Sequence, residues 1–216
     1  MSPRFGVVIF DNDGVLVDSE PLANRILSSL LSEYGLVMSA EQCMEEFLGS
    51  SLAQVRDRVS SRLATAMPAD FEARYHAQLL AGFGADLRPV DGVADLLGAL
   101  DAAGVTLCVA SSGTRERIAV ALASTGLAAW FDDRVVSVDD VARGKPCPDL
   151  FLEAARVANA KPESCAVVED SAAGVEAALA AGMTPFGYAG LTPAERLAGA
   201  RGGVVDSMAG LGVLLG

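Results

Sequence analysis

The feature that most constrains the fold of this 216-residue chain is the alternation of helical and strand patterns after Pro89. Alternation of this kind predicts a parallel, doubly wound sheet with helices on its faces. The apolar run Phe5–Phe10 adds a buried strand at the start of the chain. We therefore expect an α/β, Rossmann-like core. The expected strands are Val105–Ala110, Val135–Ser137, Cys165–Val168 and, last, Pro185–Tyr188, and the expected helices are Val93–Ala103, Arg115–Ser124, Pro148–Ala158 and Ser171–Ala181.

Residues 18–88 differ, because four helical patterns follow one another there without a strand between them. Such helices have only each other to pack against. We expect an inserted α-helical cap domain at 18–88 and an α/β core domain at 1–17 and 89–216, and we assign no element to the Gly-rich tail 199–216. The residues that define the four helices are Pro21, Leu22, Ile26, Leu27, Leu30, Leu31 and Tyr34, the capping-box pairs Ser39 with Gln42 and Ser51 with Gln54, Leu52, Val55, Val59 and Leu63, and Phe71, Tyr75, Leu79 and Phe83.

Composition and charge exclude several classes of protein. With 51% hydrophobic and 20% charged residues, the chain can form a packed core. Its net charge of −12 argues against a nucleic-acid or anionic-membrane partner. No apolar run reaches transmembrane length, and the first is too short for a signal peptide. We expect a cytoplasmic monomer or small homo-oligomer with no membrane partner, whose cysteines are reduced thiols and form no zinc site: Cys43, Cys108, Cys147 and Cys165.

Two aspartates, Asp11 and Asp13, directly follow the first expected strand. Open α/β sheets bind their ligands at the carboxyl ends of the strands. Two carboxylates at this spacing can share a Mg²⁺ ion, and one of them can act as a nucleophile. The alternative interpretation is a polar loop in which Asp11 caps a helix and Asp13-Gly14 makes a turn.

Two further polar sites lie just before core helices. The turn Ser111–Thr114 follows a strand, and its hydroxyls and backbone N–H groups suit a phosphate oxygen, although an N-cap for the next helix explains it as well. Lys145 is one of only two lysines, with Lys161. The following Pro146 disfavours the α region for Lys145 and favours a fixed, extended approach. The alternative for Lys145 is an ordinary surface lysine.

A second acidic pair, Glu169 and Asp170, ends the strand pattern Cys165–Val168. These carboxylates could complete a cation site. Alternatively, Asp170 or Ser171 caps the helix that begins there. Along the chain, the four sites therefore follow the order acid pair, hydroxyl turn, lysine and acid pair.

This order resembles the haloacid dehalogenase superfamily, in its phosphatase and β-phosphoglucomutase-like branch with a helical cap. The four motifs of that family match Asp11 to Ser19, Ser111, Lys145 to Asp149, and Glu169 to Gly174. The resemblance covers the whole chain. It implies a Mg²⁺-dependent phosphatase that hydrolyses small phosphorylated metabolites, of the sugar phosphate or phosphoglycolate class, through an aspartyl-phosphate intermediate.

The resemblance and the chemistry of the side chains imply a role for each group. Asp11 is the expected nucleophile, and Asp13 is expected to protonate the leaving oxygen and then to activate water. We expect Asp11, the backbone carbonyl of Asp13, and Asp170 to hold Mg²⁺, with Glu169 beside it. The groups expected to bind phosphate oxygens are Lys145, Ser111 and the backbone near Asn12, Asp13, Ser112 and Gly113.

Three other functions compete with that of a phosphatase. A 2-haloacid dehalogenase needs no Mg²⁺ and lacks the second acid, so Asp13 and the pair Glu169-Asp170 argue against that activity. A β-phosphoglucomutase typically carries a histidine and a cap arginine where this chain has Ala23 and Leu52, and a serine and a lysine where it has Gly113-Thr114. These departures favour hydrolysis over the mutase reaction. A non-enzymatic scaffold would have lost a catalytic group, and every group is present.

The cap is expected to select the substrate, because the core residues recognise only the phosphoryl group. The expected contacts are the turn Gly49-Ser50-Ser51 and the hinges near Asp18 and Val90. The turn carries few polar groups and is followed by no charge until Arg56, which favours a substrate with one phosphate. Rotation of Arg56 or Arg25 into the site would reverse this preference.

Overall fold

The structure, a computed structural model, describes residues 4–47, 50, 52–63 and 67–216. The chain divides into two compact units. The core unit comprises Met1–Asp18 and Arg88–Gly216, and the helical unit comprises Ser19–Leu87. That the helical unit acts as a cap remains a prediction.

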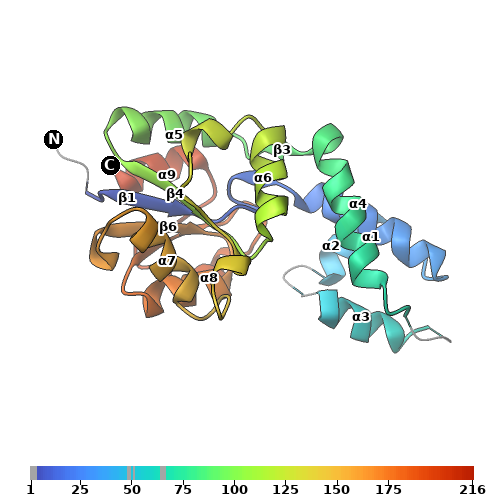
Figure 1. Cartoon of the computed structure of the whole chain (residues 1–216). Helices are drawn as coiled ribbons and strands as arrows, with labels where there is room; N and C mark the ends of the chain where they lie inside the picture. Colours follow the sequence, from blue (N-terminus) through green and yellow to red (C-terminus); the bar gives the residue numbers. More distant parts are fainter. Residues whose placement is uncertain (1–3, 48–49, 51, 64–66) are drawn as a thin grey trace. The chain divides into compact units, whose positions relative to one another are not determined.

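A six-stranded parallel sheet forms the centre of the core unit, with the strand order β5-β4-β1-β6-β7-β8 (Figure 1). β1 and β6 are buried along their whole length, as expected of central strands covered on both faces. The predicted parallel, doubly wound sheet is confirmed. The strands are β1 (Val7–Phe10), β4 (Thr106–Ala110), β5 (Val135–Val136), β6 (Cys165–Glu169), β7 (Thr184–Tyr188) and β8 (Val204–Val205).

Helices cover both faces of this sheet. α5 and α9 pack against each other on one face, and α7 and α8 lie on the other (Figure 1). On the second face, Ile9 and Val167 of the sheet join Phe151 of α7 and Ala178 of α8 in one hydrophobic core. The helices are α5 (Val93–Ala102), α6 (Arg115–Ser124), α7 (Asp149–Val157), α8 (Ala172–Ala180) and α9 (Met208–Leu215), with the 3-10 turns η1 (Ala128–Trp130), η2 (Val138–Asp140), η3 (Pro162–Ser164) and η4 (Ala194–Leu197).

The C-terminal tail corrects one prediction, since β7 is not the last strand. β8 pairs in parallel with β7, and α9 follows it. Ser207 caps α9, because its side chain accepts a hydrogen bond from Gly210 N. The two residues of β8 are too few to show a periodicity, and five of the six tail glycines precede or interrupt α9, so the sequence pattern hid both elements.

A second small ladder, which the sequence did not predict, joins the two points where the chain leaves and re-enters the core unit. β2 (Val17–Asp18) pairs antiparallel with β3 (Arg88–Pro89). Val17 lies opposite Pro89, and Asp18 lies opposite Arg88. Each strand has only two residues, and proline is uncommon within strands, so neither was recognisable from sequence.

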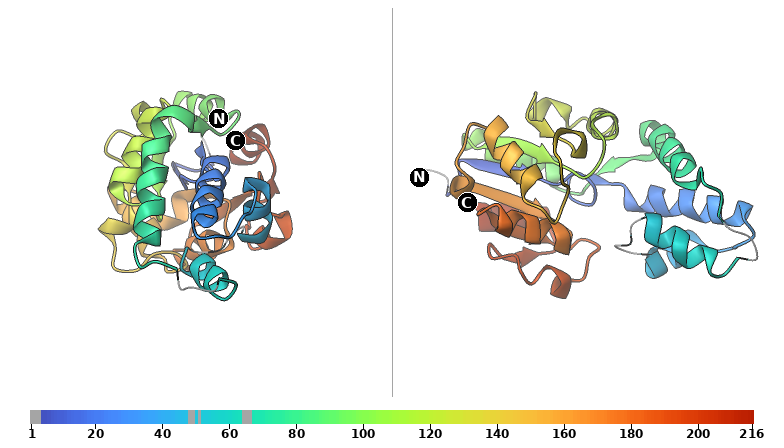
Figure 2. Two further views of the ribbon diagram at one scale, coloured as in Figure 1. Left: turned by 90° about the vertical axis from the view of Figure 1, so that its right-hand side faces the viewer. Right: turned by 60° about the horizontal axis from the view of Figure 1, so that its bottom comes forward.

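The helical unit contains α1 (Glu20–Glu33), α2 (Ala40–Phe47), α3 (Leu52–Ser60) and α4 (Phe71–Asp86), and no strand occurs among its described residues. α1 packs against both α2 and α4 (Figure 2). The four predicted helices are therefore present. The predicted capping box at Ser39 is confirmed: Gln42 N donates to Ser39 Oγ at 3.2 Å, and Ser39 N donates to Gln42 Oε1 at 2.8 Å. The second predicted box involves Ser51, which lies outside the described residues.

One close approach fixes the end of β6 against α8. A Cβ atom added to Gly174 would lie 1.9 Å from Cδ of Glu169. Glu169 is completely buried and cannot turn toward solvent. Only glycine therefore allows α8 to pass this close to the carboxyl group that ends β6.

We expect Gly174→Ala to lower the free energy of unfolding by about 2 kcal/mol, because the added methyl group overpacks a buried carboxylate. Gly98→Ala in α5 is the matched control, since its Cβ would meet the Trp130 ring at an ordinary 3.5 Å. Alanine there should raise the free energy of unfolding by about 0.5 kcal/mol through helix propensity. Urea denaturation followed by circular dichroism measures both. Equal stability of the two variants would contradict the steric argument.

Candidate active site

The sheet brings three of the predicted sites to one edge. β1 lies between β4 and β6, with Phe10 opposite both Val109 and Val168. Asp11, Ser111 and Glu169–Asp170 each end or directly follow one of these strands. The ladder continues into the acidic loop, defined here as Asp11–Gly14, since Asp11 N donates to Val168 O at 3.0 Å. The carboxyl ends of three adjacent parallel strands therefore converge on one place.

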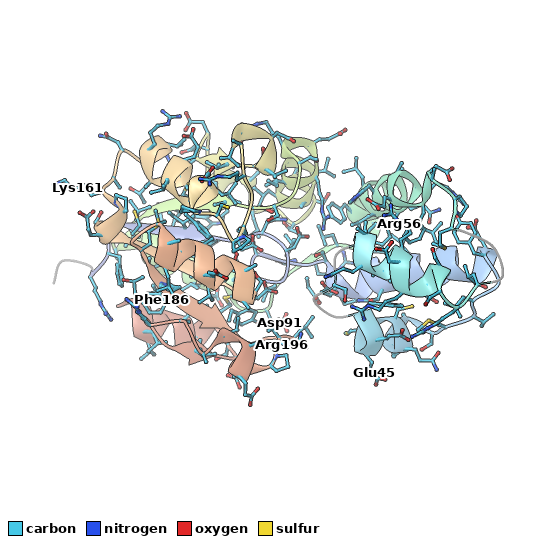
Figure 3. All side chains as sticks on the ribbon, turned by 90° about the horizontal axis from the view of Figure 1, so that it is seen from below. Glu45, Arg56, Asp91, Lys161, Phe186 and Arg196 are labelled. Carbon is cyan, nitrogen blue, oxygen red and sulfur yellow. The ribbon has the colours of Figure 1, made fainter. Side chains whose placement is uncertain are left out.

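Lys145 joins these groups from the loop before α7. Its Nζ donates to Asp11 Oδ1 and to Glu169 Oε1, each at 2.5 Å, and to Ala110 O at 3.2 Å. The Lys145 side chain is only 6% exposed, so the surface interpretation of this lysine is wrong. Lys161, by contrast, directly precedes η3 at the amino end of β6, whereas Glu169 lies at the carboxyl end of that strand (Figure 3 labels Lys161). The ammonium group of Lys145 thus links the ends of β1 and β6 through the carboxylates of Asp11 and Glu169.

Burial and charge raise the pKa values of this cluster. Desolvation raises the pKa of Asp11 to about 7, although Lys145 opposes the shift, and the neighbouring Glu169 and Asp13 add to it. Burial, followed by the charges of Asp11 and Glu169, raises the pKa of Asp170 well above its ordinary value. Burial alone would lower the pKa of Lys145, but the Asp11 and Glu169 charges outweigh it and raise that pKa. The three carboxylates of Asp11, Glu169 and Asp170 therefore carry more negative charge than the single ammonium group of Lys145 can offset.

A divalent cation fits this donor set. Among the described residues, one carboxylate oxygen each from Asp11, Glu169 and Asp170 lie within 4.8 Å of one another. Oxygen ligands of this kind are those that Mg²⁺ prefers, and a divalent cation would offset the excess negative charge. Gly14 makes room for this cluster, because its φ is +77° and a Cβ there would lie 2.1 Å from Asp170 Oδ2.

The carboxylate of Asp13 lies outside this cluster and has a different partner. Arg117 of α6 donates from Nη2 to Asp13 Oδ1 at 2.7 Å. Sequence reasoning did not single out Arg117. A signal was present, however: Arg115 and Arg117 both lie in the first turn of α6, where the helix dipole disfavours positive charge. Both arginines are bound to acidic side chains from other segments.

The hydroxyl turn (Ser111–Thr114) was given two predicted roles, and the structure shows one of them, the helix cap. Thr114 caps α6 by accepting a hydrogen bond from Arg117 N at 3.3 Å, which confirms the capping interpretation. Ser111 is buried, and its Oγ accepts from Gly113 N at 3.1 Å. Ser112 lies exposed between them. Ser111 does not cap α6, and it directly follows Ala110, whose carbonyl accepts a hydrogen bond from Lys145.

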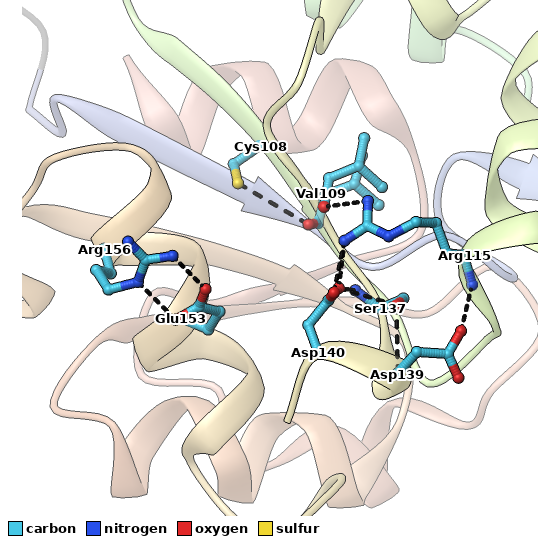
Figure 4. Close-up of polar contacts among 9 residues, drawn as sticks. Cys108, Val109, Arg115, Ser137, Asp139, Asp140, Glu153 and Arg156 are labelled. Atoms are coloured by element: carbon cyan, nitrogen blue, oxygen red, sulfur yellow. Dashed lines mark hydrogen bonds and ion pairs between the residues drawn. The ribbon is translucent and has the colours of Figure 1, made fainter. Parts of the chain in front are cut away.

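A polar network holds the hydroxyl turn from its other side (Figure 4). Arg115 binds the carboxylate of Asp140 at 2.6 Å, and its backbone N donates to Asp139 Oδ2 at 2.9 Å. Asp140 also accepts from Ser137 N at 2.8 Å and from Ser137 Oγ at 2.9 Å. The hydrogen bonds from Arg115 and Ser137 lower the pKa of Asp140 to about 2. The network ties η2 to the start of α6.

The remaining core residues predicted from sequence are all near the acidic loop or β6. Asn12 is fully buried, and its side-chain amide makes no hydrogen bond within the described part of the chain. Its backbone carbonyl accepts hydrogen bonds from Leu16 N and Val17 N at 2.9 and 3.0 Å. Ser171 caps α8 and donates from N and Oγ to Glu169 Oε2 at 3.0 and 2.8 Å. The capping interpretation of Ser171 is therefore confirmed, and the same serine fixes Glu169.

The hinges line a cavity of the core unit. Asp18 and Val90 border a volume of about 360 Å³ together with Gly14, Arg88 and Tyr188. This cavity therefore adjoins the acidic loop at Gly14. It contains a guanidinium group, carboxylates and a phenol, which can bind a polar molecule.

In the helical unit, the predicted specificity residues have partners of their own. Arg56 binds Glu72 at 2.7 Å, and Arg25 binds Asp86 at 2.7 Å (Figure 3 labels Arg56). Ser50 accepts a hydrogen bond from Arg58 at 2.5 Å. Gly49 and Ser51 lie outside the described residues, so the contact of this turn with the substrate stays a prediction. Ala23 lies in α1, and Leu52 begins α3.

Within the described residues, no helix is both long and apolar enough to cross a membrane.

Comparison with known proteins identifies the family. The family model for haloacid dehalogenase-like hydrolases matches residues 5–182. The chain is 32% identical over 184 residues to 6-phosphogluconate phosphatase of Escherichia coli, which covers 85% of this chain and 82% of that protein. A solved haloacid dehalogenase-like protein from Agrobacterium tumefaciens is 33% identical over 97% of both chains, with a TM-score of 0.86. A putative β-phosphoglucomutase from Thermotoga maritima is 28% identical over 99% of this chain and 98% of that one, with a TM-score of 0.81. As its four motifs predicted, the chain belongs to the haloacid dehalogenase-like hydrolases.

Proposed function

We propose that this protein is a Mg²⁺-dependent phosphatase that hydrolyses small phosphorylated metabolites through an aspartyl-phosphate intermediate. The observation that carries the proposal is the contact of Lys145 Nζ with both Asp11 and Glu169, at a sheet edge that also holds Ser111 and Asp170. The similarity to 6-phosphogluconate phosphatase supports a sugar phosphate or related acid as the substrate class.

Asp11 is the proposed nucleophile. Its carboxylate attacks phosphorus, the bond to the leaving oxygen breaks, and the phosphoryl group passes to Asp11. Lys145 holds Asp11 Oδ1 and offsets the repulsion between an anionic nucleophile and an anionic phosphate. When bound, Mg²⁺ would be held by Asp11, Asp170 and the carbonyl of Asp13, with Glu169 beside it, and would supply further positive charge.

Asp13 is the proposed acid and base. In the first step it gives a proton to the leaving oxygen, and in the second it takes a proton from the water that hydrolyses the aspartyl-phosphate. Its carboxylate lies outside the acidic cluster, where it binds Arg117. That separation supports a role in proton transfer and leaves metal binding by this residue to its backbone carbonyl.

Ser111 and the backbone of the hydroxyl turn are the proposed phosphate cradle. Ser111 Oγ already accepts from Gly113 N, so its own hydroxyl hydrogen can be donated to a phosphate oxygen. Ser112 N and the backbone near Asn12 and Asp13 complete the proposed cradle. The helical unit is proposed to act as the cap, and the cavity beside Gly14 is proposed to receive part of the leaving group.

The second candidate function is that of a phosphosugar mutase. It is favoured by the similarity to a putative β-phosphoglucomutase. A mutase must bind a second phosphate, and Arg25 and Arg56 are each engaged by an acid of their own unit. We therefore propose hydrolysis as the main activity and a substrate with one phosphate.

The first prediction of the proposed function is that a panel of phosphate esters reveals Mg²⁺-dependent release of inorganic phosphate. EDTA should reduce the rate to background, because the buried acids then lack their counterion. One arm of the panel is β-glucose 1-phosphate with its bisphosphate activator. Turnover that is insensitive to EDTA would contradict the metal requirement, and faster formation of glucose 6-phosphate than of inorganic phosphate would establish the mutase.

The second prediction separates the two aspartates of the acidic loop. Asp11→Asn should lower kcat by at least about a thousandfold and abolish the phosphoenzyme. Asp13→Asn should lower kcat by about 100- to 10,000-fold while Mg²⁺ binding persists. Trapping with beryllium fluoride, followed by structure determination, locates the nucleophile. A fluoride adduct on any residue other than Asp11 would refute the assignment.

The third prediction concerns the pH dependence of Mg²⁺ binding. Mg²⁺ binds ionised carboxylates, and the pKa of Asp11 without the metal is about 7. Affinity should therefore fall as pH falls below 7, by up to about tenfold per pH unit for each proton displaced. Calorimetry between pH 5 and 8 measures this slope, and Asp13→Asn should retain it. An affinity that is constant over this range would show that these carboxyls are not the ligands.

A further inference from the structure

Arg117 reaches the acidic loop from a helix in a distant part of the sequence. Its Nη2 donates to Asp13 Oδ1 at 2.7 Å, and the two side chains are 24% and 27% exposed. Partial burial limits solvent screening of this pair, and a charge-assisted hydrogen bond is stronger than a neutral one. The contact thus constrains the carboxyl group of Asp13.

The hydroxyl turn shapes the path of this side chain. Arg117 lies in the first turn of α6, where its backbone N donates a hydrogen bond to Thr114 Oγ1. A Cβ added to Gly113 would lie 3.6 Å from Arg117 Cδ, so the aliphatic part of the arginine passes over Gly113. Arg115, only two residues earlier, binds Asp140 of η2 instead. The two arginines of one helical turn thus serve different segments.

The geometry at Asp13 is compatible with proton transfer in both directions. In a protonated carboxyl group one oxygen carries the hydrogen and the other still accepts a hydrogen bond, and in the ionised group both accept. Oδ1 can therefore keep its bond to Arg117 in either state. Proton transfer needs only one oxygen, and the guanidinium fixes the plane in which that oxygen lies.

We infer that Arg117 is a positioning residue that orients the carboxyl group of Asp13 toward the leaving oxygen. The inference rests on the proposed function, because it assigns Arg117 a role through the acid of that reaction. In the first step, the Asp13 proton moves to the leaving oxygen as the bond from phosphorus to that oxygen breaks. Without Arg117, the carboxyl group would sample orientations that cannot deliver this proton.

The test compares two esters that differ in their need for an acid. An alkyl phosphate has a poor leaving group and needs the proton, whereas p-nitrophenolate leaves readily as an anion. We expect Arg117→Met to lower kcat/KM, which reports the first step only, about 10- to 100-fold on the best alkyl phosphate of the panel and less than about threefold on p-nitrophenyl phosphate. Arg117→Lys, which keeps a donor, should recover part of the loss. The KM for the alkyl phosphate should change little in both variants.

Two controls separate orientation of Asp13 from general damage. Arg115→Met removes the same charge from the same helical turn without touching Asp13, so it should leave the ratio of the two rates unchanged even if thermal denaturation shows a loss of stability. In an Asp13→Asn background, Arg117→Met should lower the alkyl phosphate rate by no more than about twofold, because the group it orients is already inactive.

The outcomes are distinguishable. An equal loss of kcat/KM on both esters, no loss on either, or a rise in the KM for the alkyl phosphate at constant kcat would each overturn the inference while leaving the phosphatase proposal intact. A full additional loss in the Asp13→Asn background would also overturn it. If the wild-type protein hydrolyses neither ester with Mg²⁺, the proposed function fails and the role of Arg117 fails with it.

Discussion

The arrangement of the site depends on one buried ammonium group, Nζ of Lys145. It binds carboxylates that come from two adjacent strands, and without it Asp11 and Glu169 would repel each other in a medium that screens charge poorly. The ammonium does not neutralise the cluster, because the half-buried Asp170 lies beside the other two acids. Burial, together with the remaining negative charge, raises the pKa of Asp11. That charge also makes the site suitable for a divalent cation.

Close backbone approaches keep these charges in place. Gly174 allows α8 to pass against Glu169, and Gly14 allows the acidic loop to pass against Asp170. Ser171 caps α8 and binds the second oxygen of Glu169 with the same hydroxyl group. Each acid is therefore held by a strand end on one side and by a turn or helix on the other, which limits the rearrangement that a reaction would require.

Most of the core of the site was predictable from sequence because strand ends place it. Asp11, Ser111 and Glu169 follow apolar runs, and parallel pairing of those runs brings them to one edge whatever the details of the loops. Arg117 was not predicted, because its contact with Asp13 depends on how α6 is oriented after the hydroxyl turn. β8 and the β2–β3 ladder were missed because two residues carry no periodicity.

The β2–β3 ladder has a consequence for how this chain can change in evolution. It hydrogen-bonds Val17–Asp18 to Arg88–Pro89, so the core closes on itself at the two points where the helical unit is inserted. For the sheet, the insertion is then a long loop with clamped ends, and the entropy of closing such a loop grows only with the logarithm of its length. Residues can be added to or removed from the helical unit at little thermodynamic cost to the sheet. The segment with the freedom to diverge is thereby separated from the segment that holds Lys145 and its partners.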